Sequence, residues 1–478
     1  MNHKVHHHHH HMDVDLGKLF FCGFNDFNEE VKEIIRKYRP TGILIYPGVL
    51  SKEYLLMDFM SFLSKEGDFL ISSDHEGGQL EVLKYVPSSP GNLAFGKNSP
   101  DVTYRYSRVA GKIMEIVGLN MVFAPVLDLL SEESSSVIDI RSYGSDPKIV
   151  AEHGARACEG YLEGGVIPCI KHFPGHGKAR EDSHLTLPVV DAPFEKLWEE
   201  DLLPFRKVLE REKKVTVMTA HVRYSSIDSL PATLSEKIIT DVLREKIGFD
   251  GLVISDAMEM SAVSNNFSVE EIVSLFLNAG GNMILLGDYR NLPVYYETLV
   301  KLLEDGKVQK DKVERSIRTV EKYLAFAKKN SGVGFLADVS MKAVEFLGFE
   351  KIDHTSEVTL LVPSSENLSQ ADTTGGDYDQ IPEIVSRFFE VENVVRYTVE
   401  DGPEFVEGDL IFDFVADIPN EKALKAHLSL PAEKTVYFVL RNPFDVRYFE
   451  GRKIVVTRST KPISIYKSLE HFLGRCDS

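Results

Sequence analysis

The sequence predicts an α/β protein: a (β/α)8 TIM-type barrel followed by a smaller α/β sandwich domain. Two observations support this. Eight short apolar runs alternate with longer amphipathic segments over roughly the first two thirds of the 478 residues, and a shorter series of the same kind follows. Strands that alternate with helices form parallel sheets, and near-continuous apolar runs are typical of strands covered on both faces. An open doubly wound sheet is the competing interpretation, but no Gly-x-Gly-x-x-Gly follows an early strand.

The expected barrel strands are short and mostly apolar. They span residues 19–23, 42–46, 69–73, 121–126, 166–170, 215–219, 251–255 and 283–286. Apolar residues spaced three and four apart predict the helices between them. These helices span residues 27–38, 53–63, 102–117, 147–162, 194–209, 235–247, 269–278 and 292–327. Eight such units match a closed barrel, which usually needs about 250 residues and tolerates insertions.

The chain divides into four expected parts. Residues 1–11 resemble an expression tag, residues 12–335 form the barrel, 336–351 a linker, and 352–478 the C-terminal α/β domain. In that last domain we expect strands at 358–362, 394–398, 409–415, 435–440 and 453–457, and helices at 381–389, 421–428 and 463–473. It carries no dense group of polar residues, so we expect the chemistry in the barrel.

Composition excludes several classes of function. A net charge of −19 argues against a nucleic-acid partner, because binding phosphates requires concentrated Lys and Arg. No apolar run reaches transmembrane length, so no membrane partner is expected. The four cysteines, Cys22, Cys158, Cys169 and Cys476, are far apart and resemble buried thiols of a reducing compartment. These features favour a cytoplasmic protein; the oligomeric state is not predicted.

The densest group of ionisable residues follows the fifth strand. The segment begins with Lys171 and His172, turns at Pro174-Gly175, and continues to Asp182 and His184. In a barrel of this type the chemistry lies at the carboxyl ends of the strands. We therefore expect these residues at the barrel mouth; a solvated loop with scattered charges is the alternative.

Other strand ends carry acids. Asp74, after the third strand, is expected to contact a ligand, whereas Glu76 is either a ligand contact or an acid that binds backbone amides. Asp128, after the fourth, is expected to be structural. Asp256 follows the seventh strand directly, so its carboxylate should point into the mouth. The alternative for Asp256 is the N-cap of a helix.

Two further residues, an arginine and a histidine, have open roles. Arg141 either enters the pocket or forms a surface ion pair, and His221 either lines the pocket or lies in the core. The remaining histidines form no His-Glu-x-x-His or related ligand pattern, and there is no Gly-x-Ser-x-Gly and no P-loop. The sequence therefore predicts neither a metal nor a cofactor.

Three segments make the chain recognisable. Lys171–Gly177 (KHFPGHG) with Asp182-Ser183-His184, and later Ile254-Ser255-Asp256, resemble glycoside hydrolase family 3. The segments at 74–78 (DHEGG), 141–144 (RSYG) and 231–235 (PATLS) support this. Within the family they resemble the bacterial exo-β-N-acetylglucosaminidase branch (NagZ type). The C-terminal domain resembles the family's second domain in order and class only.

The resemblance implies a retaining, two-step mechanism. Asp256 would be the nucleophile, and His184 the general acid/base polarised by Asp182. The residues implied to bind the sugar hydroxyls and the N-acetyl group are Asp74, Arg141, Lys171 and His172, with His221 and Met258 nearby. Between Gly175 and His184 we expect a mobile loop that closes over the substrate, with both Gly175 and Gly177 as its flexible start.

One departure from the family affects the sugar contacts. Members often read Asp-x-Glu-Gly-Gly-Arg-Val-x-Arg at the third strand, but here Gln79-Leu80-Glu81-Val82 follows Gly78, so both arginines are missing. We expect removal of terminal β-linked N-acetylglucosamine from small cell-wall or chitin-derived saccharides, as in peptidoglycan recycling. Within the family the alternatives are a β-glucosidase, a broad β-hexosaminidase or a phosphorylase. Outside enzymes, the alternative is an inactive carbohydrate-binding protein.

Overall fold

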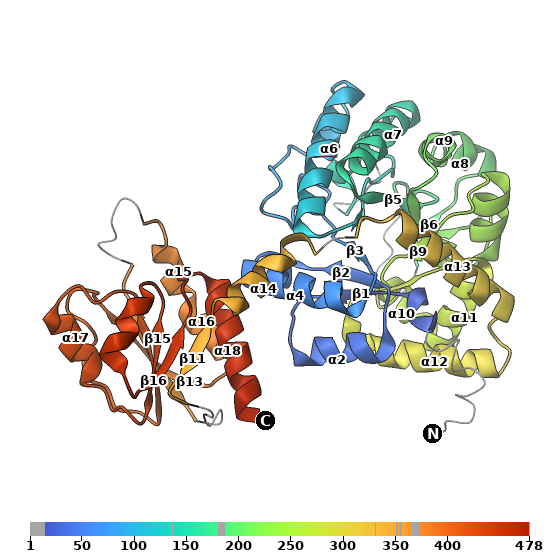
Figure 1. Cartoon of the computed structure of the whole chain (residues 1–478). Helices are drawn as coiled ribbons and strands as arrows, with labels where there is room; N and C mark the ends of the chain where they lie inside the picture. Colours follow the sequence, from blue (N-terminus) through green and yellow to red (C-terminus); the bar gives the residue numbers. More distant parts are fainter. Residues whose placement is uncertain are drawn as a thin grey trace. The chain divides into compact units, whose positions relative to one another are not determined.

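The computed structural model describes residues 15–132, 134, 137–179, 187–329, 331–349, 352, 356–365 and 372–477 (Figure 1). These fall into two compact units. The first holds the chain up to Lys52 and Phe62–Gly332; the second holds Glu53–Ser61 and the chain from Val333 on. Asp182 and His184 lie outside the described residues.

The first unit is a closed ring of eight parallel strands. The strands are β1 (Phe20–Phe24), β2 (Gly42–Ile45), β3 (Leu70–Ser72), β4 (Met121–Val122), β5 (Ile167–Phe173), β7 (Thr216–Thr219), β9 (Val253–Ser255) and β10 (Ile284–Leu286). They form two sheets of order β10-β1-β2-β3 and β4-β5-β7-β9. The sheets join where the Phe123 N–H donates to Ser73 O at 3.0 Å and where Ile254 bridges to Met283. The predicted barrel is confirmed.

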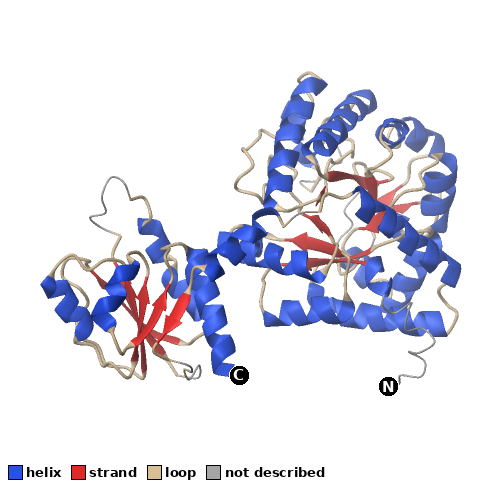
Figure 2. Ribbon diagram, in the orientation of Figure 1, coloured by secondary structure: helices blue, strands red, loops and turns tan. Residues whose placement is uncertain are grey.

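Helices surround this ring, as Figure 2 shows. The longer ones are α2 (Glu29–Tyr38), α4 (Glu53–Glu66), α6 (Pro100–Val117), α7 (Pro147–Gly164), α8 (Phe194–Glu199), α9 (Leu203–Arg211), the π-helix η4 (Lys237–Lys246), α11 (Val269–Ala279), α12 (Leu292–Glu304) and α13 (Lys310–Phe326). Side chains from every second strand position, among them Phe21, Phe123, Met218 and Ile254, fill the interior of the ring. The barrel is therefore a packed core whose chemistry must lie at an end.

Local sequence explains where elements begin and break. The Ser268 hydroxyl accepts from the Glu271 N–H, and the Glu271 carboxylate accepts from the Ser268 N–H. This capping box starts α11. The expected helix 194–209 is two helices, because Pro204 lies in the first turn of α9. The expected helix 292–327 is also two, separated near Gly306, whose φ is +70°.

Two strands differ from expectation in a way that affects the site. Strand β4 ends at Val122 rather than at residue 126, and Pro125, which has no N–H, lies in the missing part. Strand β5 continues to Phe173, so Lys171 and His172 lie on the strand and not on the loop after it. Both side chains are therefore fixed by the scaffold.

The second unit contains one six-stranded sheet of order β11-β16-β15-β14-β12-β13. Its strands are β11 (Glu345–Leu347), β12 (Val358–Pro363), β13 (Val391–Tyr397), β14 (Leu410–Val415), β15 (Thr435–Val439) and β16 (Lys453–Val456), all parallel except β11. Its helices include α14 (Phe335–Lys342), α15 (Gly375–Asp379), α16 (Ile381–Ser386), α17 (Glu421–Leu428) and α18 (Pro462–Asp477). Figure 1 shows α17 and α18 on opposite sides of this sheet. The stretch 336–351, expected as a linker, carries most of α14 and all of β11.

A search of the helices in the described residues found none both long and apolar enough to cross a membrane.

Candidate active site

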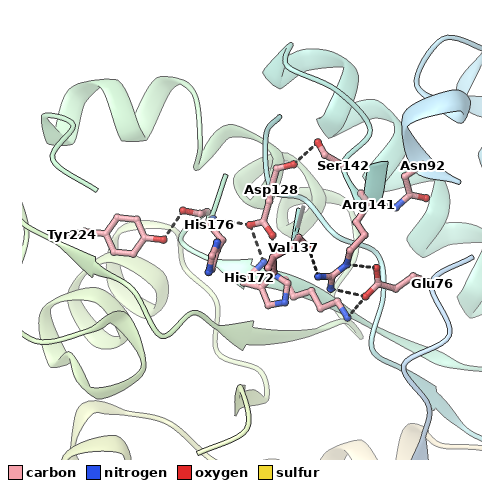
Figure 3. Close-up of polar contacts among 11 residues, drawn as sticks. Glu76, Asn92, Asp128, Val137, Arg141, Ser142, His172, His176 and Tyr224 are labelled. Atoms are coloured by element: carbon pink, nitrogen blue, oxygen red, sulfur yellow. Dashed lines mark hydrogen bonds and ion pairs between the residues drawn. The ribbon is translucent and has the colours of Figure 1, made fainter. Parts of the chain in front are cut away.

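The predicted site residues that the structure describes gather at the carboxyl end of the barrel strands. Asp74 follows β3, Lys171 and His172 lie on β5, His221 follows β7, and Asp256 follows β9. Parallel strands bring their carboxyl ends to one face of a barrel, so these side chains share its mouth. Figure 3 shows the polar contacts on one side of it, where Glu76, Arg141, Asp128, His172 and His176 meet.

Glu76 binds two cations at once. Arg141 donates from Nε to Oε1 and from Nη2 to Oε2, each at 2.8 Å, and Lys171 Nζ lies 2.7 Å from Oε2. Burial alone would raise the pKa of Glu76, but Lys171 and Arg141 outweigh it and lower the pKa to about 2. Glu76 therefore positions both cations, and among the described residues no backbone amide donates to it.

Asp74 has no such partners. Among the described residues its carboxylate forms no hydrogen bond, and it lies partly exposed at the mouth. Burial raises its pKa, and the charge of Lys171 opposes this. A carboxylate that is not satisfied by protein donors is available to accept hydrogen bonds from a ligand.

Asp128 orients His172. Its Oδ1 accepts the N–H groups of His172 (3.1 Å) and His176 (2.7 Å), and its Oδ2 lies 2.7 Å from His172 Nδ1. Burial is again outweighed, here by His172, His176 and these bonds, so the pKa of Asp128 falls to about 2. An ionised Asp128 only accepts hydrogen bonds, so His172 Nδ1 carries the proton and donates it. The role of Asp128 is structural, as expected: it holds His172 and the backbone of His176 in place within the site.

Asp256 lies directly beyond β9, and the Ala257 N–H donates to its Oδ1 at 2.8 Å. Burial would raise its pKa, yet His221, His172, the Ala257 N–H and Lys171 together lower it. The carboxylate is thus ionised near neutral pH. The next helix, α10 (Ser261–Ser264), has Met260 at its N-cap, so the N-cap alternative for Asp256 is wrong.

His221 is held at both ring nitrogens. Nε2 lies 2.8 Å from Ala257 O and must donate to it, while Nδ1 lies 2.8 Å from the Thr233 hydroxyl. Burial lowers the pKa of His221, so the neutral ring accepts at Nδ1. This histidine therefore fixes the backbone next to Asp256. Met258 is fully buried in the same segment, and its N–H donates to Leu285 O at 3.0 Å.

The loop after β5 is anchored where it begins. The Tyr224 hydroxyl donates to Gly175 O, and the Ser131 and Ser134 hydroxyls donate to Gly177 O at 3.1 and 2.7 Å. Lys178 Nζ pairs with Glu200 at 2.8 Å and Asp201 at 3.0 Å. These contacts anchor the segment at Gly175 and Gly177, where the sequence predicted a flexible start, and the loop movement itself stays a prediction. A Cβ on Gly177 would lie 1.8 Å from Leu129 O, so this glycine permits close packing.

Sequence reasoning missed two residues of the mouth. The Glu259 carboxylate accepts from the N–H groups of Gly287 (2.7 Å) and Asp288 (3.0 Å) and from Asn291 Nδ2 (2.8 Å), linking the segments after β9 and β10. Tyr46 follows β2 directly. The position of Tyr46 directly after a strand was the sequence signal that could have identified it as a residue of the mouth. Within the described ranges, no group of three or more His, Cys, Asp or Glu side chains is arranged to hold a metal ion.

Comparison with known proteins gives a consistent result. Residues 11–323 match the Glycosyl hydrolase family 3 N terminal domain, and residues 356–472 match the Beta-N-acetylglucosaminidase C-terminal domain. A crystal structure of the β-N-acetylglucosaminidase from Thermotoga maritima is 97% identical, covers 96% of this chain and 100% of that one, and has a TM-score of 0.92. Zn-bound CbsA from Thermotoga neapolitana is 61% identical, with 97% and 100% coverage and a TM-score of 0.92.

Curated relatives are more distant, and they differ in length from this chain. Beta-hexosaminidase A of Pseudoalteromonas piscicida is 28% identical over 325 residues, which are 61% of this chain and 54% of that protein. The Beta-hexosaminidase of Tolumonas auensis is 31% identical over 54% of this chain and 79% of its own length. The chain therefore spans about half the length of the first of these relatives.

Proposed function

Because the chain belongs to glycoside hydrolase family 3, we propose that it is an exo-β-N-acetylglucosaminidase acting on small cell-wall or chitin-derived saccharides. The family resemblance read from the motifs around Lys171 and Asp256 is confirmed over residues 11–323. The observation that carries the proposal is the ionised carboxylate of Asp256 at the barrel mouth, which also holds the cation of Lys171. The names of the Thermotoga and Pseudoalteromonas relatives support the substrate class.

Asp256 has the properties of a nucleophile. Its oxygen attacks the anomeric carbon, the glycosidic C–O bond breaks, and the leaving oxygen takes a proton from a general acid. In the second step the deprotonated general acid removes a proton from a water molecule, and the water oxygen attacks the anomeric carbon. The bond between that carbon and the Asp256 oxygen breaks, which releases the sugar and restores the carboxylate. A carboxylate kept ionised by His221, His172, the Ala257 N–H and Lys171 suits the first step, since only the charged form attacks.

His184, polarised by Asp182, is our candidate for the acid/base. The anchored start of its loop supports this, because Tyr224, Ser131, Ser134 and Lys178 hold the chain close to Asp128 up to Ala179. A second candidate is His172, which Asp128 orients through Nδ1 and which influences the charge of Asp256. An oriented histidine is the general requirement for an acid/base group, so the two must be separated by experiment.

The nucleophile assignment is tested with Asp256→Gly on an aryl β-N-acetylglucosaminide. We expect hydrolysis to fall by about four orders of magnitude, and added azide to restore turnover by forming the α-glycosyl azide, which a lost carboxylate alone permits. Asp305→Asn, an exposed acid far along the chain, is the matched control. Near-normal turnover of the Asp256 variant without azide would refute the assignment.

The acid/base assignment is tested by varying the leaving group. For His184→Ala, glycosides with poor leaving groups should lose far more activity than activated aryl glycosides, since only the former need the proton in the first step. For His172→Ala, we expect the same loss across the series, as for a residue that binds the sugar. The reverse pattern would transfer the acid role to His172.

The substrate class is tested by comparing the aryl β-N-acetylglucosaminide with the aryl β-glucoside, each with and without inorganic phosphate. We expect a preference for the N-acetylated sugar and free N-acetylglucosamine as the product. A preference for the glucoside would make the protein a β-glucosidase, and a sugar 1-phosphate product would make it a phosphorylase. Binding of N-acetylglucosamine without turnover of either glycoside would indicate the inactive carbohydrate-binding protein.

A further inference from the structure

Tyr46 lies at the barrel mouth and has no part in the mechanism above. It follows β2, and β2 lies between β1 and β3 in the sheet order. Its neighbours at the carboxyl edge are therefore the end of β1, at Phe24, and the segment after β3 that holds Asp74. The Tyr46 N–H donates to Phe24 O at 3.0 Å, which fixes its backbone.

Gly23 makes room for the ring, and Gly287 lies beside its hydroxyl. A Cβ on Gly23 would lie 2.5 Å from Tyr46 Cε2 and 2.6 Å from its hydroxyl oxygen. A Cβ on Gly287, beyond β10, would lie 3.4 Å from the same oxygen and 3.6 Å from the Ala257 Cβ. The ring therefore lies across the end of β1, and its hydroxyl reaches toward the segment that follows Asp256. The residue is only half-buried.

The hydroxyl is a free donor. Among the described residues it has no hydrogen-bond partner, and the charged groups that raise its pKa are the acids Asp74, Glu259, Asp256 and Asp288. Burial and these acids raise its pKa far above the usual value, so the phenol keeps its proton. Glu259 already accepts three hydrogen bonds from its own neighbours. An unused donor therefore faces the mouth beside Asp74, an unused acceptor.

The usual donors on this side of the mouth are absent. Gln79 is exposed, and Glu81 accepts from the Ser88 hydroxyl at 2.7 Å and the Ser89 N–H at 2.9 Å, so it ties its own loop together. Arg141 and Lys171 are both paired with Glu76. Lys171 keeps two further N–H groups beyond its contact with Glu76, so Tyr46 is not the sole donor near Asp74, but its hydroxyl forms no hydrogen bond with the described residues.

We propose that the Tyr46 hydroxyl binds the sugar, donating its hydrogen to a ring hydroxyl that in turn donates to Asp74. The inference rests on the proposed glycosidase function. A hydroxyl group is both donor and acceptor, so one sugar oxygen satisfies Tyr46 and Asp74 together. An acetamide group could satisfy both partners only through two separate atoms, its N–H and its carbonyl oxygen, whereas a hydroxyl does so through one oxygen, so the contact favours a hydroxyl. Tyr46 is thereby a residue that determines sugar specificity.

The test compares Tyr46→Phe with the unchanged chain on an aryl β-N-acetylglucosaminide and on its 3-deoxy, 4-deoxy and 6-deoxy analogues. On the parent sugar we expect kcat/KM to fall about tenfold, the effect of one hydrogen bond at a buried site. On the one analogue that lacks the contacted hydroxyl, the Tyr46→Phe variant and the unchanged chain should have the same kcat/KM. Equal losses on all four substrates, or no loss on the parent, would overturn the proposal.

Tyr323→Phe is the matched control. The Tyr323 hydroxyl donates to Val215 O at 2.7 Å, before β7 and therefore at the opposite end of the barrel. Tyr323→Phe should lower the unfolding temperature and leave kcat/KM unchanged, whereas Tyr46→Phe should do the reverse, because Tyr46 has no protein partner to lose. If the unchanged chain turns over no glycoside, the proposed function fails; if it does and Tyr46→Phe matches it throughout, only this inference fails.

Discussion

Each of the two units contains an aspartate–histidine pair, and the two pairs differ in access. In the barrel, Asp128 lies 2.7 Å from His172 Nδ1, and His172 borders the mouth. In the second unit, Asp413 on β14 lies 2.5 Å from His427 Nδ1 on α17, and both side chains are fully buried. Asp413 Oδ1 and His427 Nε2 have no hydrogen-bond partner in the described part of the chain.

The two aspartates also titrate in opposite directions. Asp128 accepts two backbone N–H groups beside its histidine, and its pKa falls to about 2. Burial dominates at Asp413, which has only His427 to oppose it, so its pKa rises. The comparison teaches that the pair itself does not make an acid/base device. Backbone donors that hold the acid ionised, and a histidine ring that is partly exposed at the mouth, distinguish the barrel pair from the core pair.

Removing the aspartate of the barrel pair should have the largest effect. In Asp128→Ala, His172 loses its orientation and the N–H groups of His172 and His176 lose their acceptor, so kcat/KM should fall about a thousandfold. The measurement is turnover of an aryl β-N-acetylglucosaminide, with circular dichroism to verify folding. Asp413→Ala should leave kcat/KM unchanged where the chain is folded. A similar loss in both variants would abolish the distinction between the pairs.

Removing the aspartate of the core pair should change stability instead. Asp413→Ala leaves the His427 side chain buried with no partner at either nitrogen, which should lower the free energy of unfolding by about 3 kcal/mol. Guanidinium denaturation measures this. Asp401→Ala, which breaks an exposed pair with Lys422, is the control and should change stability by less than about 1 kcal/mol. An Asp413 variant as stable as its control would contradict the role of this pair.

The pH dependence of stability should have opposite signs in the two regions. The pKa of folded Glu76 is about 2 against an ordinary 4.5, so its contribution is complete above about pH 5 and lost as the pH falls. The stability gap between the unchanged chain and Glu76→Gln should therefore shrink by up to about 3 kcal/mol between pH 6 and 2. The raised pKa of Asp413 means that acid favours the folded form there. The stability difference between the unchanged chain and Asp413→Asn should therefore change in favour of the unchanged chain as the pH falls. If both differences changed in the same direction with pH, the contrast between the two regions would be refuted.

The smallest predicted effect concerns the anchored loop. In Gly177→Ala the new Cβ meets Leu129 O, so the backbone must shift and kcat/KM should fall about tenfold. Gly376→Ala in the second unit has no atom within 4 Å of the new Cβ and should change neither activity nor stability by a measurable amount. An unaffected Gly177 variant would show that the close contact at Leu129 does not position the loop.

The barrel could be predicted from the sequence because its signal is local. Each apolar run and each amphipathic segment is read within a window of ten to twenty residues, roughly the length of one element. Ring closure followed from counting eight units. Element ends were less predictable, since they depend on single residues such as Pro125 and Pro204, and the extension of β5 to Phe173 depends on pairing with a strand that is distant in the chain.

The site was predictable only as a set of positions. The rule that chemistry lies at strand ends identified Asp74, Lys171 and Asp256 as candidates. The interaction partners of each candidate residue could not be predicted from the sequence. Glu76 and Lys171, for example, are 95 residues apart and meet only in the folded barrel. Tyr46 was missed for a related reason: an aromatic residue after a strand resembles core until its free hydroxyl is seen.

The extension of β5 has a consequence for how such proteins diversify. Lys171 and His172 belong to the framework, and the segment after them is anchored as far as Lys178. Under the proposed assignments, the stretch between Ala179 and Leu187 carries the acid/base pair and β5 carries the sugar contacts, so we expect that this stretch can be exchanged with that of a relative without replacing the sugar contacts. A chimera built this way should keep the sugar preference of the recipient and acquire the leaving-group preference of the donor. Sugar recognition by the β5 residues and proton transfer by the stretch after Ala179 would then be able to change independently of each other between relatives.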